Sequence, residues 1–221
     1  MENKNIILIA AAIIILAIIG FFAAGMLSND DTVTTPFETE FMEGSFVGNV
    51  TLVNDTEKFM HSYEDKDHDV VYNISTVDNA SALMDIYELQ GLSNPDERTF
   101  NGNQWNIYFS QAVPATTNNT TKVSNETMNV LIAESQKEKQ GYLIYMIINN
   151  GSDINTTLNT FGEGYTDYLE PLLNSITLKE SKNVPKLYEE FGLTKDQFNE
   201  QMDLIYQYKA GNLSALQGGT K

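Results

Sequence analysis

The chain has 221 residues, and without its apolar N-terminal block the remainder has the size of one ordinary domain. Acidic residues number 30 and basic residues 13, which gives a formal net charge of -17. Nucleic-acid binding requires a basic surface, so this charge excludes a nucleic-acid partner. The sequence has no cysteine, which excludes disulfides, thiolate metal sites and cysteine nucleophiles.

An uncharged apolar run extends from Ile6 to Leu27. As a helix it would be about 33 Å long, enough to cross a hydrocarbon core of roughly 30 Å. Lys4 precedes the run and Asp30 follows it, which favours a cytoplasmic N-terminus under the positive-inside rule. Residues 1–27 are therefore predicted to be a transmembrane signal anchor that contacts membrane lipid. The expected location is the cell membrane, with a single span and the C-terminal domain outside.

The alternative for this block is a cleaved signal peptide. The small residues Ala23, Ala24 and Gly25 would suit a signal peptidase. The apolar core is longer than the roughly 7 to 15 residues usual for such peptides, so an anchor is favoured over cleavage.

Ten Asn-x-Ser/Thr sequons follow the apolar run, about three times the number expected from the composition. Unused sequons in Asn- and Thr-rich loops are the alternative to glycan acceptors. The alternation of residues 70–77 predicts a strand with Asn73 facing away from Tyr72 and Ile74, on an exposed face. The predicted glycosylation sites are Asn49, Asn54, Asn73, Asn79, Asn118, Asn119, Asn125, Asn150, Asn155 and Asn212.

A short polar stretch, residues 28–42, contains Pro36 and is predicted to be a linker. Residues 46–53 are predicted to form the first strand of the domain. Residues 58–63 and 70–77 flank a polar turn and are predicted to pair as a hairpin.

The next segments alternate between a helix and a hairpin. Residues 81–90 have helical periodicity and are followed by Gly91, a typical stop signal. Asn101 and Gly102 suit a type I′ turn, because both central positions of that turn need a positive φ. Residues 113–124 are rich in Thr and Asn without a period, which predicts a surface loop.

Residues 128–133 and 142–148 are predicted to form another hairpin. The second of them, YLIYMII, is apolar at every position, which is typical of a central strand covered on both faces. Residues 154–173 are predicted to pack as a helix on the sheet, before a last short strand at residues 176–178. The predicted fold class is α+β, an antiparallel sheet flanked by helices, over residues 43–180.

Residues 181–221 are predicted to be a helical extension. Pro185 suits the first turn of a short helix that ends at Gly192. Thr194 and Gln197 match a capping box for an amphipathic helix over residues 195–209. The sequence leaves open whether this helix pair completes the domain core or docks to another chain.

Catalytic motifs with a serine nucleophile, a zinc-binding helix or a P-loop are absent from the sequence, so no enzymatic activity and no cofactor are predicted. The acidic residues, among them Glu163, Asp167 and Glu170, give no means of selecting a catalytic pair.

The segment EDKDHD, residues 64–69, begins like a calcium loop with Asp65, Asp67 and Asp69, but it lacks the glycine and the glutamate that complete the motif. His61 and His68 would form a metal site if they met across the hairpin. A polar turn without a metal is favoured. Trp105 and Tyr108 are favoured as sheet packing over an aromatic platform for sugar or peptide.

The element order of residues 44–178 resembles the PsbP-like α/β/α sandwich. The resemblance depends on an opening GSF strand, a hairpin around Tyr63, a helix at residues 82–89, the strands FNGNQWNIYF and GYLIYMII, and a closing LLNSITL. The chain is also similar to the membrane-anchored, sequon-rich surface proteins of methanogenic archaea. The PsbP family implies a non-catalytic accessory or binding role. The family's metal-binding positions have no match in this sequence, and the C-terminal helix pair lies outside the family domain.

The sequence therefore predicts a single-pass cell-surface glycoprotein with an acidic, non-catalytic binding or structural module. A surface protein or a divalent cation would be its partner. One alternative is a surface hydrolase or metal-using enzyme. Another is a sensor or assembly factor that docks another membrane protein through its C-terminal helices.

Overall fold

The computed structural model of the chain describes residues 33–57, 60–89, 91–112, 128–149, 154 and 162–212. The predicted anchor and the predicted loop at residues 113–124 lie outside these ranges. Among the described residues, none of the helices has both the length and the apolar character that a membrane span requires.

The centre of the domain is a sheet of seven strands in the order β3-β4-β5-β9-β8-β7-β6. All neighbouring strands are antiparallel, so the predicted α+β fold class is confirmed. The strands are β3 (Val50–Glu57), β4 (Met60–Asp65), β5 (Val70–Val77), β6 (Asp96–Phe100), β7 (Asn103–Ala112), β8 (Met128–Lys137) and β9 (Gln140–Asn149).

Strand β9 is the middle strand of the seven, as its sequence predicted. Each side chain from Tyr142 to Ile148 is at most 3% exposed. Alternate side chains of β9 belong to two different apolar clusters, one on each face of the sheet. The sheet is therefore the middle layer of three.

A second, smaller sheet consists of β1 (Thr34–Glu38), β2 (Met42–Val47) and β10 (Thr177–Leu178), in the order β1-β2-β10. The prediction of a linker over residues 28–42 is wrong here, because β1 belongs to the folded domain. Pro36 is compatible with β1 because an edge strand needs no donor on its outer side. The strand predicted at residues 46–53 is two strands in different sheets, separated at Gly48, whose φ is +93°.

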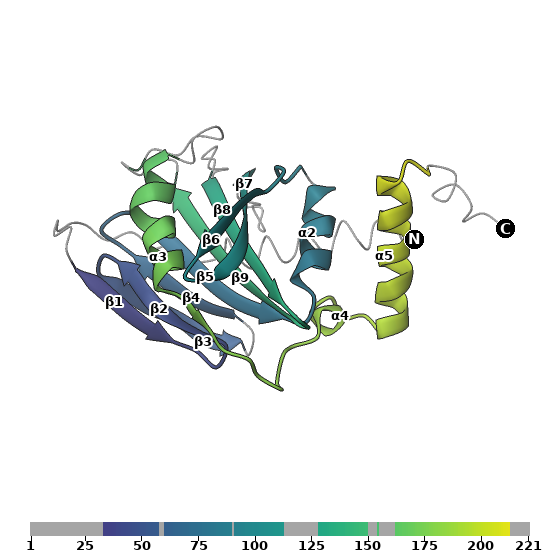
Figure 1. The fold of residues 1–221 in the computed structure, drawn as a ribbon, viewed down its shortest axis with the longest axis horizontal. Coiled ribbons are helices and arrows are strands. Elements are labelled where there is room, and N and C mark those ends of the chain that lie inside the picture. The colour runs from purple at the N-terminus through teal and green to yellow at the C-terminus, as the bar shows by residue number, and fades with distance from the viewer. Residues whose placement is uncertain are drawn as a thin grey trace, which may run out of the picture.

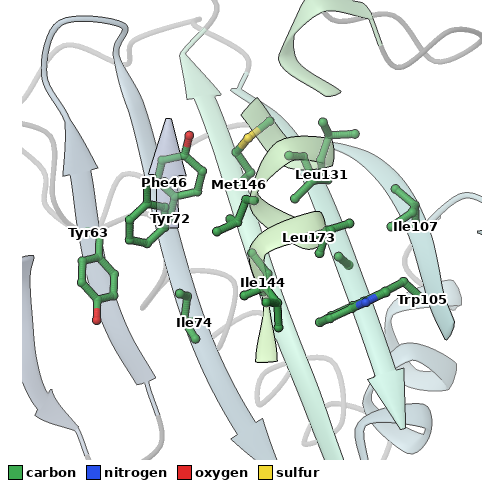
Figure 2. Packing of buried hydrophobic residues seen from close by; sticks show 14 of the residues in the cluster. Phe46, Tyr63, Tyr72, Ile74, Trp105, Ile107, Leu131, Ile144, Met146 and Leu173 are labelled. Atoms are coloured by element: carbon green, nitrogen blue, oxygen red, sulfur yellow. The ribbon is translucent and has the colours of Figure 1, made fainter. Parts of the chain in front are cut away.

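The small sheet and the helical segment η1 (Gly164–Leu169) and α3 (Glu170–Ser175) cover one face of the large sheet. Aromatic rings connect the two sheets: the Phe46 ring lies 4.7 Å from that of Tyr72 and 4.9 Å from that of Tyr63, centre to centre. Figure 2 shows these rings on β2, β5 and β4, with Leu173 of α3 over the neighbouring strands.

Helices α2 (Ala80–Glu88), α4 (Leu187–Glu190) and α5 (Lys195–Lys209) belong to the other face. Figure 1 shows α2 between the sheet and α5. The predicted capping box of Thr194 and Gln197 is present at the start of α5. Met202 and Ile205 are buried in this cluster, and the Lys209 ammonium contacts the carboxylates of Asp85 and Glu88 on α2.

This packing resolves the alternative that the sequence left open. The apolar side of α5 completes the core of its own chain. Any partner of α5 would meet its outer side, where Tyr206 and Tyr208 are exposed.

The segment between β10 and α4 carries the chain from one face of the sheet to the other. The Lys179 carbonyl accepts hydrogen bonds from Gln140 Nε2 at 2.9 Å and from Tyr142 Oη at 3.1 Å. Further along, the Leu187 amide donates to Asp78 Oδ1 at 2.9 Å, which caps the start of α4. These bonds fix the C-terminal helices to the end of the sheet that carries the β8–β9 turn.

Gly141 allows α2 to approach the sheet. A Cβ atom at this position would lie 2.3 Å from Ala80 Cβ and 2.7 Å from the Ala80 amide nitrogen. We expect Gly141→Ala to lower the free energy of unfolding by about 1–3 kcal/mol, because helix and strand must move apart. Chemical denaturation followed by circular dichroism measures the change. Lys139→Ala, on the same hairpin but exposed, is the control and should have almost no effect.

The docking of α5 leads to a second expectation. Ile205→Ala should lower the free energy of unfolding by about 2–5 kcal/mol, because it leaves a cavity between α5 and the domain. Tyr208→Ala removes an exposed side chain of the same helix and should change stability by less than about 0.5 kcal/mol. Equal effects of the two variants in thermal or urea unfolding would contradict the packing described above.

Candidate functional site

The turn between β4 and β5 contains a buried aspartate bound to a histidine. Asp65 ends β4, and its Oδ1 accepts a hydrogen bond from the Asp67 amide at 3.0 Å. This local bond is typical of aspartate at the start of a tight turn. Asp69 closes the turn with a φ of +58°, and β5 then begins at Val70. The hairpin sequence therefore folds Asp65 inward.

The second carboxylate oxygen of Asp65 lies 2.8 Å from His68 Nδ1. The Asp65 side chain is fully buried, whereas that of His68 is 23% exposed. Gly48 lies against this pair, since a Cβ atom there would be 2.6 Å from Asp65 Oδ2. The positive φ of Gly48 and this close approach both require glycine.

Two tyrosines complete the cluster. The ring of Tyr168, on the π-helical segment η1, lies 5.3 Å from the His68 ring. The Tyr72 hydroxyl is buried and has no hydrogen-bond partner among the described residues. Burial, and then the nearby Asp65 carboxylate and Tyr168, raise the pKa of Tyr72 well above its usual range, so this hydroxyl stays protonated.

The pair can act in two ways. A carboxylate at Nδ1 fixes the orientation of the imidazole. When the imidazole is neutral, the carboxylate places the imidazole proton on Nδ1. An imidazole oriented in this way is the base half of many hydrolytic sites. The same bond also attaches the hairpin turn to the rest of the domain, because Asp65 is buried against Gly48 and His68 lies against η1.

The favoured reading of residues 64–69, a polar turn, agrees with this geometry. Asp65 points into the domain while Asp69 is exposed, so the first ligands of a calcium loop do not converge. His61 pairs with Ile74 in the body of the hairpin, whereas His68 is at its turn, so the two histidines do not meet across the strands. The described part of the chain contains no group of three or more His, Asp or Glu side chains able to hold a metal ion.

A second buried carboxylate, Glu134 on β8, was not selected by sequence reasoning. Its Oε2 accepts a hydrogen bond from Asn106 Nδ2 at 2.7 Å, and its Oε1 lies 3.5 Å from the Ser81 hydroxyl of α2. Burial raises the pKa of Glu134, because no cation compensates the charge in these bonds. Its place directly after the apolar run VLIA, residues 130–133, was the one available signal.

The other acidic and aromatic candidates lie outside the Asp65–His68 cluster. Glu163 and Asp167 are exposed and Glu170 is half-buried, all three around η1 and α3. Trp105 and Tyr108 are buried on opposite faces of the large sheet, so their reading as sheet packing is confirmed.

The predicted glycan acceptors fall into four groups, one of which is the buried Asn73 alone. Asn49, Asn79 and Asn212 are exposed, and Asn79 Oδ1 also caps α2 by accepting from the Ala82 amide at 3.1 Å. Asn54 is on β3. The acceptors outside the described residues are Asn118, Asn119, Asn125, Asn150 and Asn155.

Asn73 corrects the sequence-based expectation. It does face away from Tyr72 and Ile74, but both faces of β5 are covered, and Asn73 is only 2% exposed. Its Oδ1 accepts a hydrogen bond from Ser62 at 2.7 Å, and its Nδ2 has no hydrogen-bond partner among the described residues. A glycan at this nitrogen is incompatible with the folded domain.

No protein-family model and no curated protein matches this chain. Among solved structures, a crystal structure from Bacteroides thetaiotaomicron is similar, with a TM-score of 0.39 and 8% sequence identity. The similarity covers 62% of this chain and 45% of that one, so it spans less than half of the length of the solved protein.

The Asp65–His68 bond can be tested without any assay of activity. We expect Asp65→Asn to lower the free energy of unfolding by about 1–3 kcal/mol, because a buried charge-assisted bond is lost. Asp69→Asn removes the same charge from an exposed position. Asparagine tolerates the left-handed backbone conformation there, so this variant should hardly change the free energy of unfolding. Urea unfolding measures the stability of both variants. Equal losses of unfolding free energy in the two variants would contradict a special role for Asp65.

Glu134 predicts a pH dependence of stability. Because folding raises its pKa, the native state holds this proton more tightly than the unfolded chain does. Its contribution to stability therefore decreases as the pH rises from about 4.5, the ordinary value, through the raised pKa. Glu134→Gln should be more stable than the wild type above the raised pKa and should lose that advantage in acid.

Thermal unfolding across a pH series measures this difference. Glu200→Gln, an exposed site on α5, is the matched control. A constant difference between Glu134→Gln and the wild type at all pH values would contradict the titration of Glu134.

Proposed function

We propose that the chain is a single-pass protein of the cell surface whose external, PsbP-like domain is a glycosylated, non-catalytic binding or structural module. The observation that carries this proposal is the dense apolar packing on both faces of the large sheet. Apolar side chains occupy both faces of β9 and its neighbours, which leaves the outer layers and the strand ends for contacts with other molecules. The net charge of -17 favours a basic surface or divalent cations as the partner.

The topology is supported by a different set of residues. The apolar run at residues 6–27 is long enough to span a bilayer, and all ten sequons follow it. Asn49, Asn79 and Asn212 have exposed positions suitable for a glycan.

Mass spectrometry of the protein purified from native membranes tests the proposal. We expect an N-terminus that retains the apolar run, a glycan at the exposed Asn79, and an unmodified Asn73. A new N-terminus after Gly25 would overturn the anchor and make the protein secreted. Bare asparagines at Asn49, Asn79 and Asn212 would overturn glycosylation.

A surface hydrolase is the second candidate, and the Asp65–His68 pair favours it. Hydrolysis of chromogenic esters by the full chain would be the first assay. Activity that is lost in His68→Gln but retained in His61→Gln would support this candidate, because only His68 is bound to the buried carboxylate. A wild-type protein without activity on the esters would leave the pair with its structural role.

A further inference from the structure

The chain enters the folded domain at one end of the large sheet. Val33 is the first described residue, and its carbonyl accepts a hydrogen bond from the Gly48 amide at 2.7 Å. Gly48 in turn lies against Asp65, at the start of the β4–β5 turn. We call this end, formed by Val33, Gly48, Asn49 and the turn at residues 66–69, the entry end.

The β8–β9 turn, with Glu138 and Lys139, is at the opposite end of the sheet. Strand pairing shows this directly, because Val70 at the start of β5 is opposite Ile148, while Val77 is opposite Gly141. Strand β9, with ten residues, is about 33 Å long. The two ends are therefore separated by about the length of a strand.

The connection between the predicted span and the domain is shorter than this distance. Leu27 is the last residue of the apolar run, and six residue steps lead from it to Val33. Fully extended, these steps reach at most about 22 Å. The opposite end cannot rest on the bilayer, because the entry point would then be about 33 Å from the lipid.

We propose that the entry end of the domain faces the lipid headgroups, and this orientation rests on the anchor in the proposed function. The surface chemistry agrees with it. Val33, Leu52 and Val53 are 41%, 52% and 43% exposed and lie at or near this end, where apolar side chains can contact an interface. Asp67 and Asp69 are in the same turn, so the contact depends on the tether and not on attraction to anionic lipid.

The absence of cysteine gives a clean experiment, since each introduced thiol is the only one in the chain. Asn49→Cys and Lys66→Cys place a fluorophore at the entry end, and Lys139→Cys places it at the opposite end. The full-length chain is reconstituted in phosphatidylcholine vesicles that contain a lipid with a nitroxide headgroup. We expect strong quenching at positions 49 and 66 and little at position 139.

Equal quenching at the two ends, or stronger quenching at position 139, would overturn the orientation. Flotation of the same vesicles tests the anchor separately: a chain that does not float with lipid overturns the anchor itself. A 30-residue Gly/Ser insertion after Asp31, with a root-mean-square span of about 30 Å, should remove the difference between the ends. A difference that survives this insertion would overturn the tether as its cause.

Discussion

Burial of β9 on both faces is the constraint on which the rest of the structure depends. A strand with apolar side chains on both faces needs a covering layer on each face. With only one covering layer, half of the apolar side chains would be exposed to water. The chain provides the small sheet with α3 on one side and α2 with α5 on the other. The C-terminal helices are therefore part of the core, although they follow the last strand and are attached by a single connecting segment.

Local signals in the sequence predicted the elements whose structure is determined locally. Asn101 and Gly102 both have positive φ, as a type I′ turn requires, and the capping box of Thr194 and Gln197 is formed. The small sheet was not predictable in this way, because β1 is short, contains Pro36 and is stabilised by pairing with β2. Asn73 was misplaced for a related reason: alternation identifies the face of a strand, but not whether another layer covers that face.

The Asp65–His68 pair shows the same limit for the candidate site. The composition of residues 64–69 identified the segment, yet six polar residues in a row normally form a solvated turn. Asp65 is buried because Gly48, which is distant in sequence, leaves space for its carboxylate. Glu134 is a second acidic group in the interior, and there the chain supplies an amide and a hydroxyl as partners and no cation. The two sites therefore stabilise a buried carboxylate in different ways, one by pairing with an imidazole and one by accepting hydrogen bonds from an amide and a hydroxyl.

The position of Asn73 also makes the order of events during synthesis important. Asn73 is opposite Tyr145 of β9, which is made 72 residues later. At a synthesis rate of roughly 5–20 residues per second, about 4 to 14 s pass between the synthesis of Asn73 and that of Tyr145. In the external topology proposed above, the sequon is accessible to a glycosyltransferase during that interval, and modification would then prevent the central strands from pairing. In that topology, correct assembly of this domain is a kinetic competition in which strand pairing must be completed before Asn73 is modified.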